Sequence, residues 1–160
     1  MESLPSTASP PSLLRFGALD LRIFQASDTG ALMTVELPPC PPRGLRAADL
    51  AAALECLNRH PVVPQASGKH MHFCDTLQSI PPGQTRSYGT LAATLNTSPR
   101  AVGSLCARNR LLLRIPCHRV VAAKGPGGFR AGRAWKETLL WLERDRTVFR
   151  LFSDLSPELF

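Results

Sequence analysis

The chain has 160 residues, of which 44% are apolar, so it is long enough to bury a core as one domain or as two small ones. It contains neither an apolar run of membrane-spanning length nor the basic and apolar regions of a secretory signal. We therefore exclude a membrane-spanning protein and expect a cytoplasmic one, or a nuclear one in a eukaryote.

Cysteine usage indicates a reducing compartment. The five cysteines are an odd number and include no CxxC pair, which argues against a disulfide framework.

The net charge of +7 comes from one third of the chain. Between Arg86 and Lys136 there are eight arginines and two lysines without any Asp or Glu, whereas the remainder carries nine basic and twelve acidic residues. Such a basic stretch is typical of a protein that binds a polyanion, most often a nucleic acid. The alternative is a basic surface that serves solubility alone.

The first 64 residues are predicted to contain a disordered segment and a small α/β domain. Residues 1–13 are rich in Ser and Pro, which is typical of disorder. Within residues 14–64, apolar and polar residues alternate on both sides of the turn Asp28–Gly30, which predicts a β-hairpin with one buried face. The residues predicted on that face are Leu19, Leu21, Ile23, Ala31, Met33, Val35 and Leu37.

Two further segments are predicted to be helical. Leucines at helical spacing predict a helix over Ala47–His60, which the following proline ends. Residues 67–84 are expected to form a linker and then a helix. On a strand, His70, His72 and Cys74 would share one face and could bind a metal, but on a helix they would not. Because no complementary ligand cluster is evident elsewhere, we expect no metal site.

A pair of short helices is predicted between Ser87 and Asn109. Ser87 can cap the first helix, and Ser98 can cap the second, with Pro99 at its favoured first position. Their buried faces are predicted to carry Tyr88, Leu91, Ala92, Leu95, Val102, Leu105 and Cys106, with Arg100 and Arg108 outside. In a basic stretch this pattern suggests a helix-turn-helix, although an ordinary helical hairpin would have the same pattern.

A potentially reactive thiol follows these helices in the segment Ile115–Val120. The apolar run that precedes Cys117 predicts a buried, extended segment that carries the sulfur to the floor of a cavity, and Pro116 stiffens the backbone there. Near pH 7 an unperturbed cysteine supplies only about a few per cent of the reactive thiolate. We expect His118 to activate Cys117 through a turn or a bridging water. The alternative is a buried cysteine that acts only as a small apolar residue.

The remaining elements are a loop, a helix and a tail. Residues 124–129 are glycine-rich, so they are expected to form a loop that could approach a ligand closely. A last helix is predicted from Ala134, with Trp135, Leu139 and Leu142 on one side. Glu143 follows at the edge of that face, where a carboxylate is usually solvated but could orient a buried imidazole. The tail, residues 151–160, is apolar enough to pack against an undetermined surface.

The segment Ile115–Val120 resembles the active-site signature of the O6-alkylguanine-DNA alkyltransferases, also called methylated-DNA–protein-cysteine S-methyltransferases. The likeness extends over residues 80–143, roughly two fifths of the chain. Its motifs are Ile80-Pro81-x-Gly83-x-Thr85-x-Ser87-Tyr88-Gly89, Arg100-Ala101-Val102-Gly103, Asn109, Pro116-Cys117-His118-Arg119-Val120-Val121, Gly127-Gly128-Phe129 and Lys136-x-x-Leu139-Leu140-x-x-Glu143. The resemblance implies an α+β fold, in which a small α/β N-terminal domain precedes a mainly helical domain (residues 65–150) that bears a helix-turn-helix and the cysteine.

The resemblance also implies roles for individual residues. Cys117 would accept the alkyl group, His118 would activate it through a water, Glu143 would hold His118, and Asn109 would stabilise the active-site turn. Tyr88 would act near a rotating phosphate and the purine, and Arg100 would fill the gap left by the extruded base. The other residues expected to contact DNA or the base are Ser98, Arg119, Phe129 and Arg130.

The activity implied is direct-reversal DNA repair. An O6-alkylguanine, with O4-alkylthymine as an open second substrate, would be flipped out of the duplex after minor-groove binding of the helix-turn-helix. Its alkyl group would pass irreversibly to Cys117, so each molecule would act once. No cofactor is expected, and the protein would be monomeric.

Several positions depart from the family pattern. Arg110 replaces a usual proline, which would loosen the hold of Asn109, and Arg130 replaces a serine or alanine beside the purine oxygen. Gly68 and Cys74 replace common aromatic residues, and the zinc ligands of some relatives have no counterpart here.

Three other functions were weighed. An alkyltransferase-like protein that only binds damaged DNA would lack the acceptor cysteine. A helix-turn-helix regulator with a sensing cysteine would carry an additional domain. A cysteine peptidase would need a histidine and an asparagine distant in sequence from its nucleophile.

Overall fold

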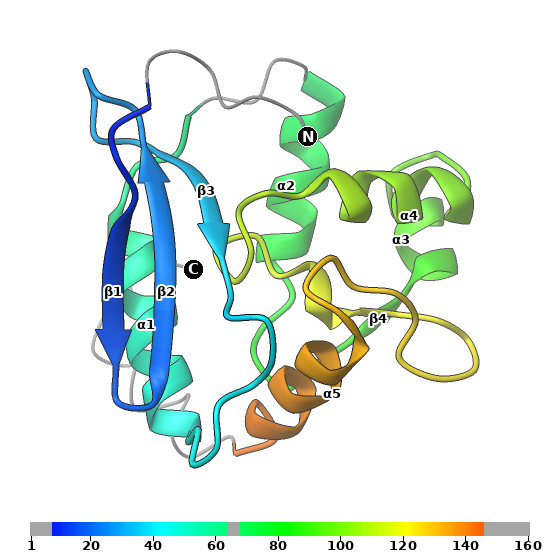
Figure 1. Cartoon of the computed structure of the whole chain (residues 1–160). Coiled ribbons are helices and arrows are strands. Elements are labelled where there is room, and N and C mark those ends of the chain that lie inside the picture. Colours follow the sequence, from blue (N-terminus) through cyan, green and yellow to red (C-terminus); the bar gives the residue numbers. More distant parts are fainter. Residues whose placement is uncertain (1–7, 64–67, 146–160) are drawn as a thin grey trace.

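The computed structural model describes residues 8–63 and 68–145, and within them it confirms the predicted α+β class (Figure 1). Strands β1 (Ser12–Phe16), β2 (Leu19–Gln25) and β3 (Leu32–Glu36) form an antiparallel sheet in that order, and helix α1 (Ala47–Arg59) packs against it. The other helices are α2 (Gly68–Gln78), α3 (Tyr88–Thr94), α4 (Pro99–Arg108) and α5 (Arg133–Leu142). A 3₁₀ turn, η1 (Cys117–Arg119), leads into β5 (Val120–Val121), which pairs in parallel with β4 (Arg86–Ser87).

The predicted hairpin is confirmed as β2 and β3, but the predicted buried face of β3 is partly wrong. Leu19, Leu21 and Ile23 of β2 are buried as expected. On β3, Leu32 is fully buried although it was assigned to the polar face. The pairing shifts at a bulge between Phe24 and Gln25, and the backbone N–H of Leu32 donates to the carbonyl of Pro61 at 2.7 Å. The segment after α1 therefore covers the start of β3.

The predicted disorder of residues 1–13 is wrong for residues 8–13. Ser12 and Leu13 belong to β1, where they pair with Ile23 and Arg22 of β2, and Ser9 N–H donates to the Gln25 carbonyl at 2.9 Å. Backbone pairing to an existing hairpin orders this segment although it buries little apolar surface, since its Leu13 side chain is exposed. Residues 1–7 lie outside the described residues.

Helices α1 and α2 are confirmed near the predicted bounds. Because α2 is helical, its His70, His72 and Cys74 do not lie on the single strand face that a metal site would require. Among residues 8–63 and 68–145, no group of three or more His, Cys, Asp or Glu is placed to hold a metal ion. No described helix is long and apolar enough to cross a membrane.

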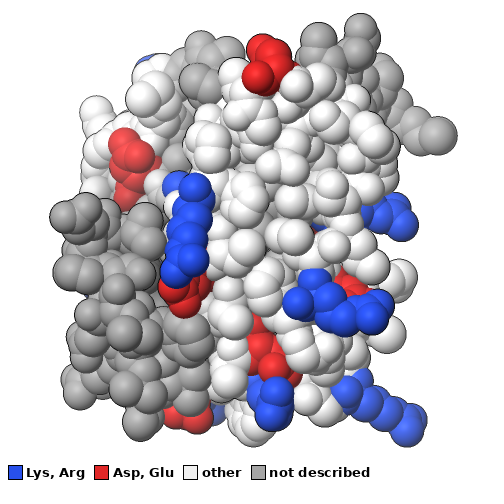
Figure 2. Space-filling model, turned by 90° about the vertical axis from the view of Figure 1, so that its left-hand side faces the viewer, with Lys and Arg blue, Asp and Glu red and all other residues white. Residues whose placement is uncertain are grey.

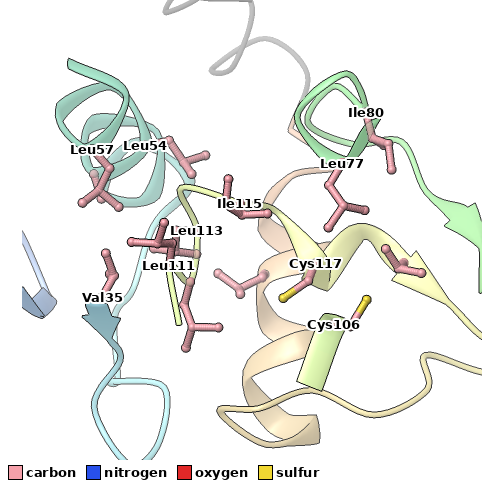
Figure 3. Close-up of a cluster of buried hydrophobic side chains, with 14 of the residues drawn as sticks. Val35, Leu54, Leu57, Leu77, Ile80, Cys106, Leu111, Leu113, Ile115 and Cys117 are labelled. Carbon is pink, nitrogen blue, oxygen red and sulfur yellow. The ribbon is translucent and has the colours of Figure 1, made fainter. Parts of the chain in front are cut away.

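The two halves of the chain share one apolar core. Leucines of α1 lie close to Leu111, Leu113 and Ile115, which lead into η1 (Figure 3). Two hydrogen bonds also join the halves: Val35 N–H donates to the Arg110 carbonyl at 2.8 Å, and Trp135 Nε1 donates to the Pro38 carbonyl at 2.7 Å. The segment that carries Cys117 is therefore packed directly on the sheet and α1.

The surface beside β1 and β2 carries charges of both signs. Figure 2 shows basic and acidic side chains next to one another on this side of the molecule. Arg15 pairs with Asp20 at 2.8 Å and Arg22 with Glu36 at 3.7 Å, and all four side chains are exposed.

Candidate active site and nucleic-acid interface

The segment before Cys117 is buried, as predicted, but it is not extended. Leu113 has a φ of +68°, and Ile115 N–H donates to the Leu111 carbonyl at 2.8 Å, so the chain folds back in a tight turn. An apolar run this short is compatible with a strand, a helix or a turn, because its pattern reports burial only. Cys117 then begins η1 and is 3% exposed.

Asn109 fixes this turn from the C-terminal end of α4. Its Nδ2 donates to the Ile115 carbonyl at 2.9 Å and to Cys117 Sγ at 3.1 Å, while its Oδ1 accepts from Leu111 N–H at 3.0 Å. All three bonds are present with Arg110 in place of proline, and the Arg110 carbonyl accepts a hydrogen bond from Val35 N–H of β3. A hydrogen-bond donor at the sulfur stabilises a thiolate more than a thiol.

Cys117 lies at a cavity of about 220 Å³. The lining residues are Tyr88, Gly103, Cys106, Ala107, Cys117, Gly128, Phe129 and Arg130. The sulfur can therefore meet a small ligand although little of its surface is exposed. Cys106 of α4 lies near Cys117 in this wall (Figure 3).

His118 and Glu143 form a fully buried pair on the other side of η1. His118 Nε2 lies 2.8 Å from Glu143 Oε1, and both side chains are 0% exposed. Among the described residues, His118 Nδ1 has no hydrogen-bond partner. If Nε2 carries the proton toward the carboxylate, Nδ1 is left as a proton acceptor.

The predicted DNA contact of Arg119 is contradicted by its position. Its guanidinium is buried, donates to both carboxylate oxygens of Glu143 at 2.8–3.3 Å, and donates to the Ile80 carbonyl at 2.6 Å. Gly83 N–H adds a bond to Glu143 at 3.3 Å. Arg119 is therefore a structural ion-pair partner of Glu143, because a carboxylate can be buried only if it is paired.

Burial and charge oppose each other at these groups. Burial raises the pKa of Cys117, although the Asn109 bond and then the cations Lys136 and Arg130 act against this. Burial lowers the pKa of His118 in spite of Glu143, which keeps the imidazole neutral. Burial alone would raise the pKa of Glu143, but the charges and bonds of His118 and Arg119 lower it to about 2. The carboxylate is thus ionised and able to hold an imidazole.

The chain matches a known family over this region. Residues 69–145 match the family model described as the 6-O-methylguanine DNA methyltransferase DNA-binding domain. This match covers slightly less than half of the chain. The chain is 48% identical over 83 residues to a methylated-DNA–protein-cysteine methyltransferase of Methanopyrus kandleri, which covers 52% of this chain and 63% of the relative. It is 51% identical over 61 residues to the methylated-DNA–protein-cysteine methyltransferase of Sulfolobus acidocaldarius, and this match covers 38% of this chain and 39% of the relative. The chain thus matches less than two thirds of the length of these curated relatives.

Solved structures extend the likeness in fold to most of the chain. The crystal structure of Mycobacterium tuberculosis OGT in complex with DNA has a TM-score of 0.64 and 23% identity, and the match covers 84% of this chain and 92% of that one. The O6-methylguanine DNA methyltransferase of Methanococcus jannaschii has a TM-score of 0.59 and 27% identity, with 84% and 93% covered. The likeness in fold therefore includes the sheet and α1 as well as residues 69–145.

Lys136 of this domain has a position that the sequence pattern did not indicate. It is 0% exposed, and its Nζ donates to the Val120 carbonyl at 2.6 Å and the Gly128 carbonyl at 2.8 Å. The ammonium also lies 5.7 Å from the Tyr88 ring centroid. Lys136 thereby ties β5 to the glycine loop and places a positive charge near Cys117. Its position on the inner face of α5, between Trp135 and Leu139, was the available signal.

The predicted base-contacting residues separate into two groups. Tyr88, Phe129 and Arg130 line the cavity at Cys117, and the Phe129 ring packs edge-on against His118 with centroids 6.3 Å apart. Ser98 and Arg100 lie instead at the start of α4 and are absent from that lining. The Ser98 hydroxyl accepts from Ala101 N–H at 3.2 Å, which confirms the predicted cap. Arg100 is exposed on the outer face of α4, as predicted.

The predicted cap of the preceding helix is also confirmed. The Ser87 hydroxyl accepts from Thr90 N–H at 3.0 Å, and the buried faces of α3 and α4 include Leu91, Ala92, Val102 and Cys106. The two helices pack together around the break at Asn96, as a helix-turn-helix requires.

Proposed function

We propose that this protein repairs alkylated DNA by moving the alkyl group of O6-alkylguanine irreversibly to its own Cys117. The observation that carries the proposal is a thiol at a small cavity, bonded by Asn109 and followed in the chain by a buried imidazole that an ionised Glu143 holds. The family match of residues 69–145 supports it. The named relatives are methylated-DNA–protein-cysteine methyltransferases.

In the proposed reaction, Cys117 loses its proton to His118 through a bridging water, and the resulting imidazolium is stabilised by Glu143. The thiolate then attacks the alkyl carbon in line. A sulfur–carbon bond forms while the carbon–O6 bond breaks, and its electron pair leaves with guanine, which takes up a proton donated by the Tyr88 hydroxyl. The imidazolium then returns its proton through water to Tyr88, so that the thiol proton ends on guanine. The thioether product is a poor leaving group, so each molecule acts once. No cofactor is required.

The proposed partner is double-stranded DNA, bound through the minor groove by the α3–α4 helix-turn-helix. The described exposed cations of this region, among them Arg86, Arg100 and Lys124, support a polyanion partner. The target base would be flipped into the cavity, and Arg100, exposed on α4, would fill the gap. We propose a monomer that acts in the cytoplasm, or in the nucleus of a eukaryote, and the free cysteines among the described residues are consistent with a reducing compartment.

Mapping the transferred group tests the proposal. Wild-type protein is mixed with duplex DNA that carries radiolabelled O6-methylguanine, and the labelled peptide is identified. We expect about one methyl per protein on Cys117 and none in Cys117→Ser, as a single-use acceptor requires. Cys106→Ser is the matched control, because Cys106 lines the same cavity and should be dispensable. Label on Cys106 in the wild type, or transfer by Cys117→Ser, would overturn the assignment.

A further inference from the structure

A second pocket lies beside the Cys117 cavity and has a strongly basic lining. Its volume is about 540 Å³, and its walls include Arg108, Arg110 and Arg130, together with His70 and Cys74 of α2. Among the described residues that line it, none is Asp or Glu. We call this hollow the arginine pocket.

Its three arginines come from separate parts of the domain. Arg108 is the last residue of α4, Arg110 follows Asn109, and Arg130 belongs to the glycine loop. Since like charges repel, three guanidinium groups around one hollow favour an anionic ligand. Guanidinium groups match phosphate oxygens in geometry and charge.

A fourth cation adds to this charge. Arg114 lies near Cys74, a residue of the pocket wall, where its charge acts to lower the pKa of the thiol, although burial and then the charge of Asp75 raise that pKa to about 11. Among the described residues, Arg114 Nε has no hydrogen-bond partner. The carbonyl end of α4 brings partial negative charge to the same wall. Arg130 Nη1 donates to the Ala107 carbonyl there at 3.2 Å, so its positive charge offsets the partial negative charge of the helix end.

The arginine pocket adjoins the cavity at Cys117. Ala107 and Arg130 belong to the walls of both, so a ligand in one is next to the other. A nucleotide whose base enters the cavity remains linked on both sides to phosphates. We propose that the arginine pocket binds a backbone phosphate of the strand whose base enters the Cys117 cavity. The proposal rests on the proposed function, because it takes DNA to be the partner.

The double variant Arg108→Gln, Arg110→Gln tests this. The affinity for undamaged duplex DNA is measured against salt concentration. We expect roughly ten-fold weaker binding at moderate salt and a log–log salt slope smaller by about 1, as the loss of one phosphate contact predicts. The matched control is Arg15→Gln, Arg22→Gln on the sheet, which removes the same charge and should leave the slope unchanged. An unchanged slope in the first variant, or equal changes in both, would overturn the proposal.

Two further measurements separate the remaining outcomes. Inorganic phosphate is titrated into the wild type and the double variant without DNA. If the double variant loses phosphate binding but keeps the wild-type salt slope for DNA, the pocket binds free anions and the DNA assignment is overturned. Methyl transfer from the free base O6-methylguanine is followed in parallel and should equal that of the wild type, which shows that the variant is folded. Absence of transfer in the wild type would refute the proposed function, while the slopes would still decide on the pocket.

Discussion

Arginines have different surroundings in the two halves of this molecule. On the sheet, Arg15 and Arg22 lie in water beside carboxylates, and such exposed pairs are worth little. In residues 69–145, Arg119 is buried against Glu143, whereas Arg100 and Arg108 are exposed in a stretch without acids. The difference teaches that the number of basic residues in a segment does not give the number of cations exposed to a polyanion, because some of them are buried. Part of the basic stretch organises the reactive site from inside, and another part, which includes Arg100 and Arg108, is exposed.

The largest expected effect comes from replacing the arginine of the buried ion pair by methionine, compared with the same replacement in an exposed ion pair. Arg119→Met should lower the free energy of unfolding by about 3–5 kcal/mol, because it leaves part of the charge of Glu143 buried without a partner. Arg22→Met on β2 should lower it by less than about 1 kcal/mol. Urea denaturation measures both. Similar losses would mean that burial does not distinguish the two regions.

Acid should lower the free energy of unfolding mainly through the buried groups of residues 69–145 and less through the exposed ion pairs of the sheet. The pKa of Glu143 is about 2 in the folded protein and 4.5 in the unfolded chain, so its contribution of about 3 kcal/mol is present above pH 4.5 and is lost as the pH falls toward 2. Burial lowers the pKa of His118 below 6.5, so the unfolded chain takes up a proton there before the folded protein does. The free energy of unfolding should therefore be higher above pH 6.5 and fall as the pH drops below it. The free energy of unfolding is measured against pH for two variants. The control Glu36→Gln should lose stability below pH 4.5 as the wild type does, whereas Glu143→Gln should lack this loss between pH 4.5 and 2.

Lys136→Met should cost about 2 kcal/mol of stability, because the carbonyls of Val120 and Gly128 lose a buried donor. It should also raise the pKa of Cys117 further, since a nearby cation is removed. The rate of Cys117 alkylation by free O6-methylguanine should therefore fall at pH 7, and its pH profile should move to higher pH. Lys124→Met, in the exposed loop, is the control. An unmoved profile in Lys136→Met would contradict the electrostatic role.

The smallest effect compares two glycines with left-handed backbones. Gly30→Ala in the hairpin and Gly127→Ala in the loop should each cost about 1 kcal/mol, because both φ angles are positive. Only at Gly127 would the new Cβ meet the Tyr88 ring, at 3.0 Å. Gly127→Ala should therefore slow transfer from duplex DNA, and Gly30→Ala should not. Equal rates would show that Tyr88 adjusts without consequence.

Much of the fold was predictable from local chemistry. Hydroxyl caps at Ser87 and Ser98 start helices because they satisfy free backbone N–H groups, and Pro99 fits the first position of α4. The hairpin followed from alternation and a turn. The contacts of Cys117, His118, Asn109 and Glu143 agree with the roles that the resemblance implied, and those roles remain predictions.

Other features depend on contacts between segments far apart in the chain. The turn at Leu113 could not be read from an apolar run, since burial does not specify φ. Strands β4 and β5 have two residues each, too few for a periodic signal. Arg119 and Lys136 looked like surface cations because their partners, Glu143 and two loop carbonyls, become neighbours only on folding. The composition of residues 8–13 concealed a strand that pairs through its backbone.

The bond from Val35 to the Arg110 carbonyl has a practical consequence for anyone who wants a smaller version of this protein. Removing the sheet and α1 would uncover Leu111, Leu113 and Ile115, which belong to the turn that Asn109 fixes. Such a fragment would keep every residue of the family signature and still lose the support that holds the sulfur in place. A minimal working unit must include the sheet.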